Sequence, residues 1–267
     1  EFPNVAVHIP TNIAADNEEV PINREWQTIV LVHGHAGDLE SESNQMMKRE
    51  ILKYRDANVI IVDWSASSKL SYSNAAGAVP GVGRLLAEFL ITLESQKEIV
   101  EDDNVDDISD NPLYYDNAIK IDVKTIASRI ESQGIGRIQF SNLHLVGFNL
   151  GAHVVGHAAR EITLRTGARV ARITGLDPSR SQWGSGSSRL ARTDATYVEV
   201  IHTDGDGLLS NGLGTAVGDV DFFVNGGSNQ PGWPTNYLRC LRHISSQHRK
   251  NLPILIFIDK MIVSCKY

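Results

Sequence analysis

The sequence has few cysteines and no long block of positive charge. Cys240 and Cys265 are its only cysteines in 267 residues, so at most one internal disulfide can form. Lysine and arginine number 25 against 32 acidic residues, which gives a formal net charge of −7. No basic run is longer than Arg249-Lys250, whereas nucleic-acid-binding surfaces concentrate basic residues. We therefore expect no nucleic-acid partner, and two cysteines are too few to indicate the redox compartment.

Long apolar runs are missing as well. No apolar stretch approaches the roughly 18 residues of a membrane-spanning helix, so we expect no transmembrane segment. Hydrophobic residues make up 42% of the chain, and 22 glycines and 9 prolines are near average usage, which excludes a disordered or collagen-like chain. The length predicts one domain over residues 1–267. No signal-like segment follows Glu1, which we interpret as a processed or trimmed chain.

Acidic residues concentrate in one segment, residues 94–116. It holds nine acidic residues and one lysine, a net charge of −8. Such a segment has too little apolar surface to offset the entropy lost on ordering, so we expect a mobile surface insertion. Tyr114 and Tyr115 lie beside the acids and make a docking or modification segment the alternative.

Strand-like and helix-like patterns alternate along the rest of the chain. β-branched or apolar runs predict strands at residues 28–32, 59–62, 143–146, 169–174 and 197–201. Apolar residues at helical spacing predict helices at 79–93, 121–130 and 152–162. This alternation predicts an α/β fold with a mostly parallel central sheet and helices on both faces. Sites in such sheets lie at the carboxyl ends of the strands.

The third predicted strand runs into a catalytic-type turn. Gly147-Phe-Asn-Leu-Gly151 has the spacing of the nucleophile elbow Gly-x-Ser-x-Gly, whose glycines let strand and helix backbones pass closely. Asn149 stands at the nucleophile position, and an amide has no hydroxyl or thiol for a base to activate. Asparagine nevertheless tolerates positive φ better than most residues. The substitution can thus keep the turn and remove the chemistry.

Three further groups complete the pattern of an acyl-transfer site. The backbone N–H of His35, after the first strand, would face that of Leu150 as an oxyanion donor. Asp177 follows a later strand, where its carboxylate could orient an imidazole. His243 and His248 come last, so the chain order is that of the α/β-hydrolases. Each residue alone is more often structural, and their order favours the catalytic interpretation.

With these residues in place, the sequence resembles the animal neutral lipases of the pancreatic lipase type, within the α/β-hydrolase fold. The resemblance covers about residues 29–261. It rests on the runs Leu31-Val-His-Gly-His35, Val62-Asp-Trp-Ser65, Gly147-Phe-Asn-Leu-Gly-Ala-His153, Thr174-Gly-Leu-Asp-Pro178, Val200-Ile-His-Thr-Asp204 and 221–232. At the matching positions it implies a degenerate triad of Asn149, Asp177 and a histidine. It implies no cofactor and no metal ion.

The sequence departs from the family pattern in the region of the lid. Trp233 stands where the family has the first lid cysteine, which leaves Cys265 as the partner available to Cys240. Only six residues separate Trp233 from Cys240, so we expect a short lid and no large cap for triglyceride.

The triad histidine and one further position also depart from the pattern. His243 is three residues after Cys240 instead of two, and counting back from residues 256–259 favours His248 instead, so both stay candidates. Asp219 replaces a family histidine.

The resemblance also suggests a role. We expect no C-terminal β-sandwich domain after Tyr267, and among the single-domain insect members of the family some yolk proteins lack the serine. We therefore expect a catalytically inactive lipase homologue that serves as a yolk or storage protein. We expect it to be secreted and then held in yolk granules. Its expected partners are a lipid or small apolar ligand and an oocyte uptake receptor, and a homo-oligomer is compatible with this role. The alternatives are an active carboxylic-ester hydrolase or phospholipase A1-like enzyme, and a lipase-fold carrier or interaction protein.

Overall fold

The computed structural model describes residues 5–9, 22–95, 120–125, 138–205 and 210–228. Its strands are β1 (Val5–Ile9), β2 (Gln27–Val32), β3 (Ala57–Asp63), β4 (Lys120–Thr125), β5 (Leu143–Phe148), β6 (Arg172–Leu176), β7 (Tyr197–His202) and β8 (Val220–Phe223). Its helices are α1 (Glu42–Tyr54), α2 (Ser65–Ser68), α3 (Tyr72–Ser95) and α4 (Leu150–Thr166), with 3-10 turns η1 (Phe140–Asn142) and η2 (Val224–Gly227).

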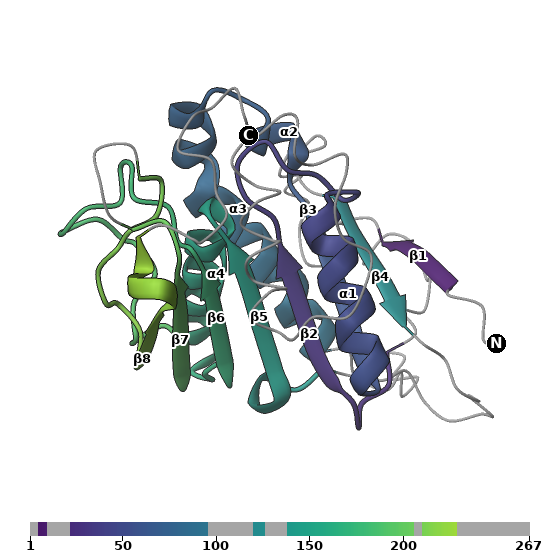
Figure 1. Ribbon diagram of the computed structural model, residues 1–267. Coiled ribbons are helices and arrows are strands. Elements are labelled where there is room, and N and C mark those ends of the chain that lie inside the picture. The colour runs from purple at the N-terminus through teal and green to yellow at the C-terminus, as the bar shows by residue number, and fades with distance from the viewer. Residues whose placement is uncertain (1–4, 10–21, 96–119, 126–137, 206–209, 229–267) are drawn as a thin grey trace.

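These strands form one sheet in the order β1-β4-β3-β2-β5-β6-β7-β8 (Figure 1). Strands β3, β2, β5, β6, β7 and β8 run parallel, while β4 is antiparallel to β3 and β1 is antiparallel to β4. The predicted mostly parallel sheet is therefore confirmed. The parallel strands bring their carboxyl ends to one edge, which is where the predicted site residues of β2, β5 and β6 meet.

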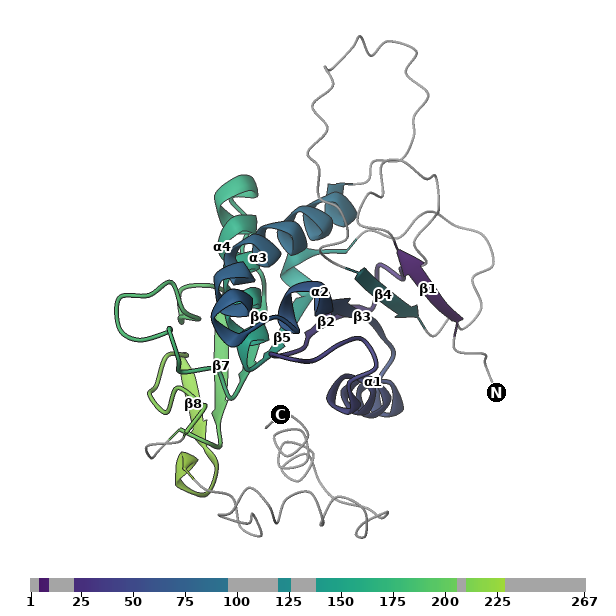
Figure 2. The same ribbon diagram turned by 90° about the horizontal axis from the view of Figure 1, so that it is seen from above.

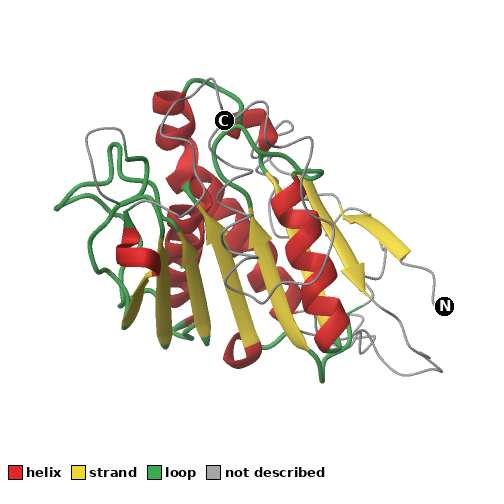
Figure 3. Ribbon diagram, in the orientation of Figure 1, coloured by secondary structure: helices red, strands yellow, loops and turns green. Residues whose placement is uncertain are grey.

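Helices cover both faces of the sheet. Figure 3 shows α1 in front of the strands and α3 and α4 behind them, and the view from above agrees (Figure 2). Alternate residues of β2 enter the two cores: Val30 and Val32 pack on the α3 and α4 side, and Ile29 and Leu31 on the α1 side. Because both faces of the sheet are buried, a central strand such as β2 is a continuous apolar run in the sequence.

Helix α3 is long and apolar enough to cross a membrane by length and composition alone, although half of its apolar window is buried inside the structure. Leu86 and Leu90 are fully buried in the core that α3 shares with α4 and the sheet. Burial in this core accounts for the apolar character of the helix.

One predicted element is wrong. The sequence predicts a helix at residues 121–130, but Lys120–Thr125 forms strand β4, which pairs with β3 and β1. The run Ile121-Asp-Val-Lys-Thr125 alternates apolar and polar residues, a period of two that fits a strand better than a helix. Pairing with β3 and β1, which are distant in sequence, then stabilises the strand over the locally predicted helix.

Other predictions hold with shifted boundaries or lie outside the described residues. Helix α3 begins earlier than predicted and extends to Ser95, so the first two residues of the acidic insertion are helical. Strand β6 begins three residues later than predicted, at Arg172. The following predictions concern residues outside the described ranges: the insertion from residue 96 onward with Tyr114 and Tyr115, the histidines His243 and His248, and the cysteines Cys240 and Cys265.

Candidate active site at the β5–α4 turn

Asn149 is the single residue between β5 and α4, and it adopts φ 53° and ψ −115°. The two glycines around it permit a very close approach of strand and helix. A Cβ atom at Gly147 would lie 2.3 Å from the carbonyl oxygen of Gly151, and one at Gly151 would lie 2.3 Å from that of Val32. The turn therefore has the geometry of a nucleophile elbow, with an amide at its tip.

The Asn149 side chain lies against the loop that follows β2. Its Oδ1 accepts a hydrogen bond of 3.3 Å from the backbone N–H of His35. Its own N–H donates to the Leu176 carbonyl at 3.0 Å, and its carbonyl accepts from the N–H of Ser179 at 3.3 Å. The amide oxygen thus occupies the acceptor position in front of the N–H predicted as an oxyanion donor.

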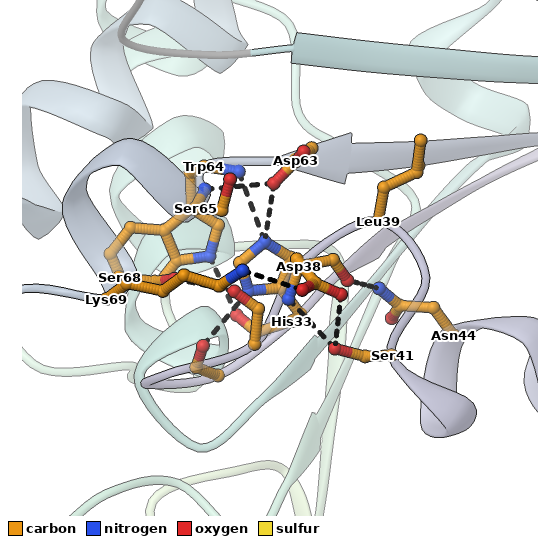
Figure 4. A network of polar contacts seen from close by, with 12 residues as sticks. His33, Asp38, Leu39, Ser41, Asn44, Asp63, Trp64, Ser65, Ser68 and Lys69 are labelled. Atoms are coloured by element: carbon orange, nitrogen blue, oxygen red, sulfur yellow. Dashed lines mark hydrogen bonds and ion pairs between the residues drawn. The ribbon is translucent and has the colours of Figure 1, made fainter.

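The loop after β2 is held by a buried histidine, His33 (Figure 4). Its Nδ1–H donates to the Gly34 carbonyl at 3.0 Å, and its Nε2 accepts from the N–H of Trp64 at 3.1 Å. The Trp64 indole in turn donates to the His33 carbonyl at 2.8 Å. His33 Nε2 also lies 3.4 Å from Asp63 Oδ1, so the ring contacts that carboxylate as well as the backbone of Trp64.

The same network fixes the rest of this loop. The N–H of Ala36 donates to the Ser68 carbonyl at 2.8 Å, and the Ser68 hydroxyl donates to the Gly37 carbonyl at 2.8 Å (Figure 4). Gly34 also packs closely on the elbow, because a Cβ there would lie 2.8 Å from Cβ of Asn149. These contacts hold the His35 N–H in place independently of any ligand.

Asp177 follows β6 and is only 5% exposed. Its Oδ1 accepts hydrogen bonds from the backbone N–H groups of Thr203, at 3.1 Å, and Asp204, at 3.2 Å. Burial raises the pKa of this carboxyl, although the two backbone hydrogen bonds oppose that shift. The structure therefore places the predicted acid in a fixed position at the carboxyl edge of the sheet, where it could orient an imidazole.

Sequence reasoning assigned no role to His153, which lies in α4 and is fully buried. Its Nε2–H donates to the Ser179 carbonyl at 2.8 Å, and its Nδ1 accepts from the Leu190 N–H at 3.1 Å. The ring stacks on Trp183 at 4.2 Å between centroids. Burial lowers the pKa of His153 to about 3, so the side chain is neutral and joins α4 to the loop after Asp177. His153 is the last residue of the lipase-like run 147–153, but the spacing of that run does not predict these contacts.

Tyr72 connects the start of α3 to the same region. Its hydroxyl lies 2.6 Å from Ser179 Oγ and donates to the Ser181 carbonyl at 2.8 Å. The His35 ring meets the Tyr72 ring edge-on at 5.4 Å, and its Nε2–H donates to the Leu70 carbonyl at 3.0 Å. Helix α3, the loop after β2 and the loop after β6 therefore converge around Asn149.

The structure brings together Asn149, the His35 N–H and Asp177 from three neighbouring strand ends. Leu150 is the first residue of α4, where backbone N–H groups have no partner within the helix. His243 and His248 lie outside the described residues. Within the described part of the chain, no group of three or more His, Cys, Asp or Glu side chains is placed to hold a metal ion.

Known proteins share this sequence pattern. The family model described as Lipase matches residues 3–108 and 123–251. The chain belongs to the lipase family. It is 31% identical over 218 residues to a pancreatic triacylglycerol lipase of Myocastor coypus, covering 79% of this chain and 38% of the relative.

Two further relatives extend the match. The human pancreatic triacylglycerol lipase is 29% identical over 235 residues, covering 85% of this chain and 41% of the relative. Lipase member H of Xenopus tropicalis is 28% identical over 249 residues, covering 91% of this chain and 43% of the relative. The chain thus spans about two fifths of the length of these curated relatives.

Proposed function

We propose that this member of the lipase family is catalytically inactive. The observation that supports this is the residue at the tip of the elbow: Asn149 carries an amide, and acyl transfer through this position needs a hydroxyl or thiol that a base can activate. The amide oxygen also accepts the His35 hydrogen bond, so it occupies the position where a substrate oxyanion would bind. Both the nucleophile and the stabilisation of the intermediate are then affected by one residue.

We further propose that the protein acts as a secreted yolk or storage protein. The support is the resemblance to insect family members that lack the serine, together with the match to the family over residues 3–108 and 123–251. The residual cleft would hold a lipid or another small apolar ligand, and an oocyte receptor would mediate uptake. The alternative is a carrier or interaction protein on the same framework. It would bind a ligand in the same way but would not accumulate in bulk.

Residual hydrolysis is the second candidate function. The His35 loop and Asp177 are both held by buried hydrogen bonds, so part of the machinery keeps its geometry. Oxyanion donors and binding alone leave a residual acceleration of about 10³ over water when a triad residue is missing. That value is an upper bound here, because Asn149 Oδ1 already accepts from the His35 N–H. Weak hydrolysis of an activated ester is therefore compatible with the proposal, whereas turnover at enzyme rates is not.

Two measurements test the proposal. Hydrolysis of a soluble short-chain ester by the purified protein should stay far below ordinary enzyme turnover of about 1–10³ s⁻¹; a rate within that range contradicts inactivity. Quantitative mass spectrometry of egg and haemolymph extract should find the chain among the abundant proteins. A trace amount in both tissues contradicts storage and favours the carrier or interaction role.

A further inference from the structure

The backbone conformation of Asn149 places the backbone nitrogen of Leu150 beside the Asn149 side chain. Viewed along the C–Cα bond, the N and Cβ substituents of Cα are about 120° apart. For an L-residue, ψ of −115° therefore turns the nitrogen of Leu150 almost into line with Cβ of Asn149. This eclipsed arrangement is the one required by a five-membered ring made of Leu150 N and the carbonyl carbon, Cα, Cβ and Cγ of Asn149.

We propose that Asn149 is a site of spontaneous deamidation in the folded protein. The deprotonated nitrogen of Leu150 attacks Cγ of Asn149, and a bond forms between the two atoms. The bond from Cγ to Nδ2 breaks, and the amide leaves as ammonia with the proton lost by Leu150. Water then adds to either carbonyl of the resulting succinimide, giving aspartate in a normal chain or isoaspartate in a chain that runs through Cβ.

A hydrogen-bond donor already faces the atom that becomes charged in this reaction. When nitrogen attacks Cγ, negative charge develops on Oδ1, and Oδ1 accepts the N–H of His35 at 3.3 Å. A fixed backbone donor aimed at a developing oxyanion lowers the barrier. The positive end of the 17-residue helix α4 favours the same charge, and it also favours deprotonation of the Leu150 N–H, which has no intrahelical acceptor. The oxyanion donor would thus act on the protein's own side chain.

The chain contains a matched control for this chemistry. Asn142 is also followed by leucine, so both asparagines have the same neighbour on the reacting side. Asn142 lies in the 3-10 turn η1, where ψ is about −20° to −30°, far from the eclipsed arrangement. Its amide donates to the Trp26 carbonyl at 3.3 Å. Both residues fall in the tryptic peptide 138–160, so one spectrum compares them directly.

The test is an ageing experiment on the full-length protein at neutral and mildly alkaline pH, once folded and once in urea. Peptide mapping of residues 138–160 measures conversion of amide to acid, and fragmentation assigns it to Asn142 or Asn149. In urea we expect equal, slow rates at the two sites. In the folded protein we expect Asn149 to react about tenfold faster than in urea, because the His35 N–H stabilises the negative charge that develops on Oδ1. We expect Asn142 to react more slowly in the folded protein than in urea.

Two variants support the assignment. In Asn149→Gln the same attack needs a six-membered ring, so acid formation at this position should fall to the level of Asn142. Asn149→Asp provides the standard for the aspartate product, and isoaspartate is recognised as the isobaric peptide with a different retention time. A folded-state rate at Asn149 equal to or below its rate in urea overturns the proposal, as does the absence of reaction in both states.

Discussion

At the scale of single residues, Asn149 has separate effects on backbone and chemistry. Its backbone takes the positive φ of 53° that the elbow requires, which asparagine tolerates better than most residues. Its side chain replaces a nucleophile by an acceptor that satisfies the His35 N–H. The turn therefore has the shape of an elbow, while the residue at its tip carries an amide and no hydroxyl or thiol.

Restoring serine at this position should restore little activity. A triad needs a base within about 3 Å of the nucleophile, and three histidines near the elbow already make other contacts. His35 donates its Nε2–H to the Leu70 carbonyl. His33 and His153 each use both ring nitrogens in buried hydrogen bonds. We expect the candidates His243 and His248 to be shifted in register relative to the family. Asn149→Ser, assayed with a soluble short-chain ester, should remain well below about 1 s⁻¹, and turnover above that value would show that the base is in place.

Because His153 is buried and neutral, we expect the free energy of unfolding to depend on pH. Its pKa is lowered by burial from 6.5 to about 3 in the folded state, so between these values the unfolded chain binds a proton that the folded chain does not. Stability is therefore lost as pH falls below 6.5. Between pH 6.5 and 5 this residue should remove about 2 kcal/mol from the free energy of unfolding.

The matched variant for this effect is His153→Gln, which lacks the titrating group. Urea denaturation at several pH values should give a smaller loss of stability on acidification for the variant than for the parent protein. The replacement can lower stability at every pH, so the slope is the relevant measurement. Equal slopes for the two proteins would contradict a neutral buried His153.

At the scale of elements, the elbow depends on close packing of β5, α4 and β2. A Cβ at Gly151 would lie 2.3 Å from the Val32 carbonyl oxygen, so Gly151→Ala forces strand and helix apart. We expect a loss of about 3 kcal/mol in the free energy of unfolding. The control is Gly77→Ala in α3, where a Cβ meets nothing within 4 Å and alanine favours the helix by up to about 1 kcal/mol. Chemical denaturation that finds equal stability for the two variants would contradict the packing described for the elbow.

Local patterns predicted some elements and missed others for identifiable reasons. Strands β2, β3 and β5 are buried on both faces, so each appears as a continuous apolar run in the sequence. Strand β4 was mistaken for a helix because its alternating pattern is short and its pairing partners are distant. The exposed edge strand β8, at Val220–Phe223, carries too few buried positions to be recognised.

The candidate site shows the same division between local and long-range information. The glycine spacing around Asn149 predicted the turn, because the constraint is local. The contact between Asn149 Oδ1 and the His35 N–H joins residues 114 positions apart, and the contacts of His153 span 26 and 37 positions. Such contacts exist only after the sheet has formed, so spacing in the sequence could not reveal them.

At the scale of the whole molecule, the acidic segment should be dispensable for folding. Its net charge of −8 over residues 94–116 causes self-repulsion, and few of its side chains are apolar. Deleting residues 95–111 would join the end of α3 to the approach to β4 through a shorter connection, at small entropic cost. We expect an almost unchanged melting temperature. A fall of more than about 5 °C, equivalent to about 2 kcal/mol in a domain of this size, would mean that the segment packs on the body.

The proposed inactivity requires that this lipase framework contains no activatable nucleophile. An organophosphonate lipase probe tests this directly, because it forms a covalent bond only with an activated oxygen or sulfur nucleophile. After incubation with the probe, intact-mass spectrometry of the purified protein should show no adduct, while an active pancreatic-type lipase treated in parallel is fully labelled. A stoichiometric adduct, mapped to a serine of this chain and abolished by His248→Ala or His243→Ala, would contradict the proposed inactivity.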